Sequence, residues 1–167
     1  MESTVSSWPK DKAQLYPLLV RQAASLAEGC PLPLPVLANC AALLWEALDG
    51  LNWVGFYLLK GERLYLGPFQ GRVACVEIPM GRGVCGTAAA TGCAQVVPDV
   101  HAFPGHIACD SASRSELVLP LMKGSLLVGV MDLDSPLPGR FDAADAEGLG
   151  AVCKVIMACT SWKDGLL

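Results

Sequence analysis

Apolar residues recur at helical spacing near both ends of the chain. In residues 35–48 they are spaced three or four apart, which places them on one face of a helix. These positions are Leu37, Cys40, Ala41, Leu44 and Leu48. A similar pattern predicts a helix over residues 11–28, with Pro17 near its start, and a last helix beginning near Asp142. The segment GCPLPLP, residues 29–35, separates the first two helices.

Between these helical regions the pattern changes to short apolar runs bounded by turn residues, which are typical of β-strands. We expect strands over residues 53–59, 63–66, 72–79, 94–97, 117–122 and 126–133. A helix of small residues is expected over 84–91, and residues 98–114 form a long loop without a clear period. This order predicts an α+β fold in which terminal helices cover an antiparallel sheet. We expect one domain over residues 1–167, with residues 1–34 as a helical extension and linker.

Composition supports a folded core and argues against several partners. The chain has 167 residues, of which 53% are hydrophobic and 17% charged, so it has ample apolar surface to bury. The net charge is −4 and the basic residues are scattered, so nucleic acid is not an expected partner. The first residues do not resemble a signal peptide, and the longest apolar runs are too short to span a membrane. We therefore expect a cytoplasmic protein without membrane association.

Eight cysteines draw attention to thiol chemistry. In a cytoplasmic chain of this length, a clustered subset indicates catalysis or metal binding in preference to a disulfide scaffold. Cys75, Cys85 and Cys109 lie among small or charged residues, where a reactive thiol is expected. The other five are interpreted as ordinary structural residues: Cys30, Cys40, Cys93, Cys153 and Cys159.

Two kinds of chemistry compete for the three thiols. Cys85 follows a glycine-rich turn at an expected helix start, where the helix dipole favours a thiolate. One thiol would then be oxidised to a sulfenic acid and a second would condense with it. Alternatively, His106 and Cys109 have ligand-like spacing, and His101, Cys75 and Cys85 would complete a zinc site. Because the chain has no CxxC pair, we expect neither a metal nor another cofactor.

A group of carboxylates provides a second candidate feature. Strand alternation over residues 126–134 puts Asp132 and Asp134 at the end of an otherwise apolar face, and Glu116 starts the preceding strand. Adjacent carboxylates repel, so at least one pKa should rise unless a cation, such as a ligand ammonium or a metal, lies between them. The alternative is that the strand ends at Leu133 and both aspartates are solvated.

Aromatic residues mark the first expected strand. Trp53, Gly55 and Tyr57 share one face, and Gly55 would leave a slot between two rings for a small apolar group. The alternative is that both rings pack in the core.

Five segments together resemble the free methionine-(R)-sulfoxide reductases, which are single GAF domains. The segments are NWVGFYLL, LGPFQGRVACVEIPMGRGVCGTA, DVHAFPGHIACDSASRSELVLPL, VGVMDLDSP and GRFDAAD, and they cover residues 51–147 in register. The resemblance implies an antiparallel sheet of about six strands with helices on one side. It also implies a homodimer and thioredoxin as the reductant.

The resemblance assigns roles to the residues already selected. Cys109 matches the catalytic cysteine, Cys75 the resolving cysteine that forms a disulfide with it, and Cys85 a third redox cysteine. The carboxylates that bind the substrate's α-ammonium match Glu116, Asp132 and Asp134. The aromatic wall around the sulfoxide end matches Trp53 and Tyr57.

We therefore expect an enzyme that reduces free L-methionine-(R)-sulfoxide through sulfenic acid and disulfide intermediates. A competing hypothesis is a non-catalytic GAF domain that senses a small ligand or a redox change.

Overall fold

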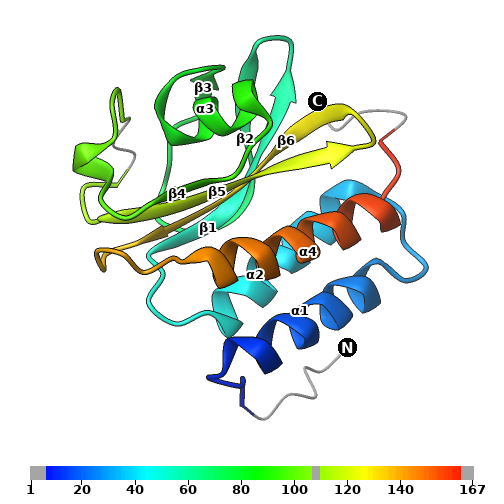
Figure 1. Ribbon diagram of the computed structural model, residues 1–167. Coiled ribbons are helices and arrows are strands. Elements are labelled where there is room, and N and C mark those ends of the chain that lie inside the picture. Colours follow the sequence, from blue (N-terminus) through cyan, green and yellow to red (C-terminus); the bar gives the residue numbers. More distant parts are fainter. Residues whose placement is uncertain (1–6, 107–109, 163–167) are drawn as a thin grey trace.

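Three helices cover one face of a six-stranded antiparallel sheet, and a fourth lies on the other face (Figure 1). The computed structural model describes residues 7–106 and 110–162. The helices are α1 (Lys12–Ala27), α2 (Pro33–Ala47), α3 (Gly83–Thr91) and α4 (Ala143–Cys159), with a short 3-10 helix at Val100–Ala102. The strands are β1 (Trp53–Lys60), β2 (Arg63–Gly71), β3 (Glu77–Pro79), β4 (Gln95–Val97), β5 (Ser115–Lys123) and β6 (Leu126–Ser135). Their order in the sheet is β3-β2-β1-β6-β5-β4, which confirms the predicted α+β fold.

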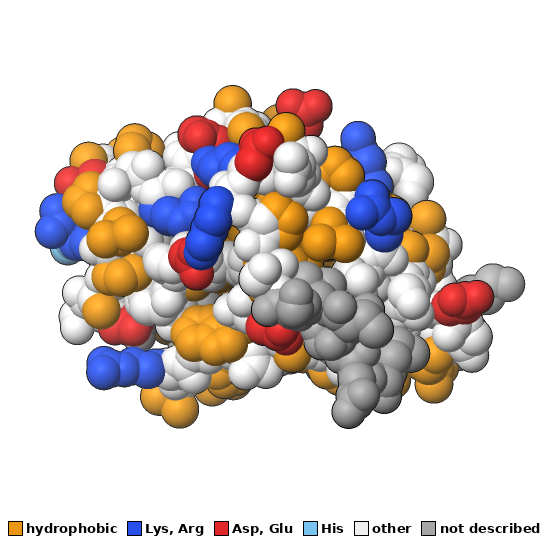
Figure 2. Space-filling model, turned by 90° about the horizontal axis from the view of Figure 1, so that it is seen from below, with side chains coloured by type: hydrophobic (Ala, Val, Ile, Leu, Met, Phe, Trp, Pro, Cys, Tyr) orange, Lys and Arg blue, Asp and Glu red, His pale blue; other side chains and the backbone are white. Residues whose placement is uncertain are grey.

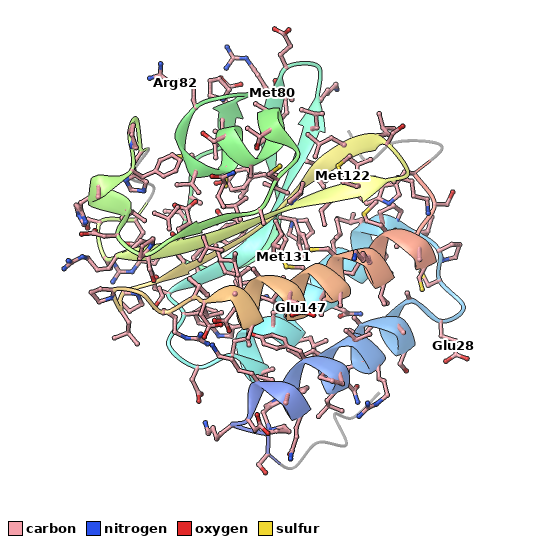
Figure 3. All side chains as sticks on the ribbon, in the orientation of Figure 1. Glu28, Met80, Arg82, Met122, Met131 and Glu147 are labelled. Atoms are coloured by element: carbon pink, nitrogen blue, oxygen red, sulfur yellow. The ribbon has the colours of Figure 1, made fainter. Side chains whose placement is uncertain are left out.

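Alternation along the strands divides the interior into two apolar clusters, one on each face of the sheet. In β6, Met131 and Leu133 pack with α1, α2 and α4, whereas Val130 packs with α3 on the other face. Figure 3 shows Met131 between the sheet and α4. The pairing of β5 with β6 shifts near Val128, which therefore packs on the helical side. Strict alternation over residues 126–134 would put Val128 and Val130 on the same face, and this bulge places them on opposite faces.

The helical layer is held by a buried polar cluster as well as by apolar packing. The last helix begins after Asp142, as the sequence predicted, and the side chains of Asp142 and Asp145 form a capping box by accepting hydrogen bonds from each other's backbone N–H groups. Asp145 is only 1% exposed and accepts hydrogen bonds from Tyr16 of α1 and Lys12. Gly148 of α4 lets Tyr16 approach closely, because a methyl group there would lie 2.0 Å from Tyr16 Cγ. These contacts fix α1 against α4.

Several elements differ in length from the sequence prediction. β2 continues to Gly71, five residues beyond the predicted strand end at residue 66, because β1 keeps pairing with it as far as Trp53 opposite Gly71. The strand predicted over residues 72–79 is reduced to β3, so Cys75 lies in an irregular segment and not on a strand. β6 runs to Ser135, which includes both aspartates in the strand and excludes the alternative that it ends at Leu133.

The surface carries charges of both signs. Seen from the helical side, lysine and arginine side chains of the described residues are interspersed with aspartates and glutamates (Figure 2). In the part of the chain that the structure describes, helices are too short or too polar to cross a membrane.

Candidate active site

Three carboxyl groups meet on the face of the sheet that α3 covers. Glu116 of β5 lies directly opposite Asp134 of β6, and Val118 lies opposite Asp132, so the acids occupy neighbouring positions on two paired strands. Glu116 and Asp132 are 6% and 5% exposed, and Asp134 is half-buried. The predicted carboxylate group therefore exists in the fold, and it is removed from bulk water.

Burial and mutual repulsion change the acidity of this group. Burial is the largest cause that raises the pKa of Asp132 from 3.8 to about 7. Burial, followed by repulsion from Asp132, also raises the pKa values of Glu116 and Asp134 well above their ordinary range. The prediction that at least one pKa rises is confirmed. The group will hold protons near neutral pH unless a cation offsets its charge.

Cys85 lies against the carboxyls at the first turn of α3. Its Sγ is 3.9 Å from Glu116 Oε1, and the thiol is 4% exposed. Burial and the nearby charges of Asp132 and Glu116 raise the pKa of Cys85 well above 9.0. The prediction that Cys85 is a thiolate is therefore wrong. The helix dipole contributes only about 0.3–1 kcal/mol, which does not offset burial beside two acids.

The two histidines lie in different environments. His106 Nε2 is 3.8 Å from Glu116 Oε2, and burial lowers the pKa of the ring. His101 is exposed and its Nδ1 is 3.0 Å from Asp99 Oδ1. His106 lies beside the three carboxyls and lines the cavity, whereas His101 contacts a surface aspartate and does not line it.

A small cavity opens onto these side chains. It leaves about 30 Å³ for the centres of water-sized molecules. Its lining residues are Ile78, Arg82, Gly83, Val84, Cys85, His106, Asp110, Ser113, Glu116, Asp132 and Asp134. Exposed Arg82 lies at the outer edge, before α3 (Figure 3). Among the described residues, lysines and arginines form no ion pair with the three carboxyls.

The predicted aromatic residues lie beside the cavity and do not line it. Trp53 and Tyr57 are 3% and 1% exposed, and their rings stack 5.9 Å apart. Trp53 Nε1 donates to Arg72 O, and the Tyr57 hydroxyl donates to Cys75 O. They therefore hold the segment before β3, and their contact with a substrate stays a prediction. The slot expected at Gly55 is filled, since a methyl there would lie 2.4 Å from the Cβ of Phe69.

Of the two remaining predicted cysteines, only Cys75 lies among the described residues. Cys75 is half-buried and disulfide-bonded, between the exposed side chains of Val73 and Val76. Cys109 lies outside the described residues, so its predicted role as the nucleophile stays a prediction.

Sequence reasoning missed one polar residue that connects β1 to the loop after Cys109. Asn52 Nδ2 donates to Asp110 Oδ2 and to Ser113 Oγ, each at 3.0 Å. The backbone N–H of Asn52 also donates to Asp134 O at 3.0 Å. The available signal was an amide side chain directly before an aromatic strand, in the segment NWVGFYLL.

Comparison with known proteins agrees with this geometry. The GAF domain family matches residues 34–159. A free methionine-R-sulfoxide reductase of Escherichia coli (strain K12) is 49% identical over 156 residues, which cover 92% of this chain and 94% of that protein. One from Saccharomyces cerevisiae is 45% identical over 128 residues, covering 72% and 71%. The X-ray structure of the enzyme from Neisseria meningitidis, in complex with its substrate, superposes with a TM-score of 0.90 at 45% identity and covers 95% of each chain. This chain is therefore a GAF-domain oxidoreductase that belongs to the free methionine-R-sulfoxide reductase family.

Proposed function

We propose that this protein reduces free L-methionine-(R)-sulfoxide to methionine, and that Glu116, Asp132 and Asp134 bind the α-ammonium of the substrate. The observation that carries the proposal is the cluster of these three carboxyls, which is removed from bulk water and has no lysine or arginine counter-ion among the described residues. Removing one partner of a buried ion pair costs about 3–5 kcal/mol. A free amino acid supplies the missing cation, whereas a methionine sulfoxide within a peptide does not.

The reaction would begin with the thiolate of Cys109. It attacks the sulfoxide sulfur, the sulfoxide oxygen takes up a proton and is transferred to Cys109 as a sulfenic acid, and methionine leaves. The candidate proton donor is a carboxyl of this cluster, because burial raises the pKa values of all three acids.

Recycling would use the segment that carries Cys75. The Cys75 thiol attacks the sulfenic sulfur of Cys109, water leaves, and a disulfide forms. The dithiol of thioredoxin then reduces this disulfide and becomes oxidised itself. Val73 and Val76, which are 89% and 73% exposed beside Cys75, offer thioredoxin an apolar contact. A relay through Cys85 stays a prediction, and the environment of Cys85 favours a protonated thiol that contacts Glu116.

We also propose that the enzyme is a cytoplasmic homodimer. The neighbouring side chains of Leu32 and Leu34, at the start of α2, are 61% and 53% exposed and would be buried between two subunits.

The test is a coupled NADPH, thioredoxin reductase and thioredoxin assay on free and N-acetylated methionine sulfoxide. We expect kcat/KM to fall by about a hundred-fold or more on N-acetylation, which corresponds to the loss of one buried ion pair. Cys109→Ser should abolish turnover, and Cys93→Ser, a change at an exposed cysteine, should not alter it. Equal rates on the two substrates would contradict ammonium recognition, and stoichiometric oxidation without turnover would favour a redox sensor.

A further inference from the structure

We propose that the same cavity binds a thiophilic divalent cation such as Zn²⁺ or Co²⁺, with Cys85, Glu116 and Asp132 as ligands, and that the cation inhibits the enzyme. The predicted inhibition rests on the proposed function, but the binding does not. The cation is an inhibitor here and not a cofactor.

The three ligand atoms are already close together. The Sγ of Cys85 and one carboxyl oxygen each of Glu116 and Asp132 all lie within 4.8 Å of one another. Tetrahedral zinc, with bonds of about 2.0–2.3 Å, separates its ligand atoms by about 3.3–3.8 Å. The 3.9 Å between Cys85 Sγ and Glu116 Oε1 is near this range, so small side-chain rotations complete the geometry.

Asp132 gives an independent sign that a ligand is missing. Its Oδ1 is buried without a hydrogen-bond partner, and the residue is only 5% exposed and lines the cavity. A buried acceptor left in this state is destabilising by about 1–3 kcal/mol. The roughly 30 Å³ that the cavity leaves for the centres of water-sized molecules accommodates an ion.

The donor types select the kind of cation. A thiolate with two carboxylates suits Zn²⁺ and Co²⁺, whereas Mg²⁺ and Ca²⁺ prefer oxygen ligands alone. His106 Nε2 lies 3.8 Å from Glu116 Oε2 and is outside the set of three close ligand atoms, so water would complete the coordination. On binding, the thiol proton of Cys85 and the proton of any protonated carboxyl among Glu116 and Asp132 pass to the buffer. Because the cation and the substrate ammonium need the same oxygens of Glu116 and Asp132, they exclude each other.

The experiment is a Co²⁺ titration of the reduced, full-length protein, followed by the thiolate-to-cobalt charge-transfer band in the near ultraviolet. Cys85→Ser should remove this band and raise the dissociation constant about ten-fold or more. The matched controls are Cys93→Ser and Cys159→Ser, which change exposed cysteines and should keep the band. Asp132→Asn should weaken binding by a similar factor, and it tests the site even if Cys85→Ser does not fold.

Competition provides a readout on the unmodified protein. Free methionine should displace Co²⁺ in proportion to its concentration and further than glycine does, since glycine chelates Co²⁺ in solution through the same amine and carboxylate, and N-acetylmethionine should not displace it. A band that survives in Cys85→Ser, or binding that free methionine does not affect, would overturn the proposal. The cobalt titration needs no turnover, so the proposed reductase activity and this site can fail independently. In the coupled assay, Zn²⁺ should raise the KM for free methionine sulfoxide without lowering kcat.

Discussion

Asp132→Asn should make the folded protein more stable at pH 8 while it removes most of the activity. In the unfolded chain the carboxyl ionises near 3.8, and in the folded protein burial raises the pKa of Asp132 to about 7. Between these values the folded protein keeps a proton that the unfolded chain has already released. The free energy of unfolding therefore falls as the pH rises from about 4 to about 7.

The size of this effect follows from the difference in pKa. With 1.36 kcal/mol for each pKa unit, ionised Asp132 destabilises the folded state by as much as about 4 kcal/mol above pH 7. Glu116 and Asp134, whose pKa values are raised as well, add to the same trend. Asparagine has nearly the same shape and never ionises, so its contribution does not change with pH.

The assay is urea unfolding of the reduced protein at several values between pH 5 and pH 8, without substrate. The advantage of the variant over the parent should grow by about 3 kcal/mol between pH 5 and pH 8, so the stability of the variant depends less steeply on pH. Asp99→Asn is the control, because the lowered pKa of this exposed carboxyl leaves it ionised in both states over the whole range. Equal slopes for the parent and Asp132→Asn would refute the reasoning.

Two further substitutions test other parts of the structure. Gly148→Ala places a methyl group 2.0 Å from Tyr16 Cγ and should lower the free energy of unfolding by about 2–4 kcal/mol, as measured in urea. The control Gly150→Ala, on the same helix with nothing within 4 Å, should instead stabilise by about 0.5–1 kcal/mol, and a less stable Gly150→Ala would contradict this account. Asn52→Ala removes the hydrogen bonds to Asp110 and Ser113, which follow Cys109, and should lower kcat about 10–100-fold with little change in stability. The exposed Asn39→Ala should leave kcat unchanged, and an equal effect of both variants would argue against positioning by Asn52.

The sequence predicted the layers of the fold because each layer depends on a local period. Helical spacing identified α1, α2 and α4, and alternation placed the acidic side chains of β6 on one face. The lengths of β2 and β3 depend on partners distant in the sequence. Gly67 and Pro68 follow the predicted end of the strand, and they lie where the register between β1 and β2 shifts, where a bulge accepts proline. The apolar segment around Cys75 suggested a strand, but β2 pairs with only three residues of β3.

The candidate site was only partly predictable for a similar reason. The cluster of three carboxyls could be predicted from strand alternation and the β5–β6 hairpin, because both are local features of the sequence. The acidity of Cys85 depends on Glu116 and Asp132, which the sheet brings to it from more than thirty positions away in the sequence. The role of Asn52 depends on Asp110 and so could not be recognised from the residues around it.

Because β6 is pleated, alternate side chains of this ten-residue strand point to the helical core and to the candidate site. Leu133 belongs to the helical core and Asp132 to the cavity, although they are adjacent in the chain. Deleting one residue from this strand would turn a carboxylate toward the hydrocarbon interior and a leucine toward the ligand. Point substitutions can thus alter ligand preference and core packing separately, whereas an insertion or deletion here would abolish both at once.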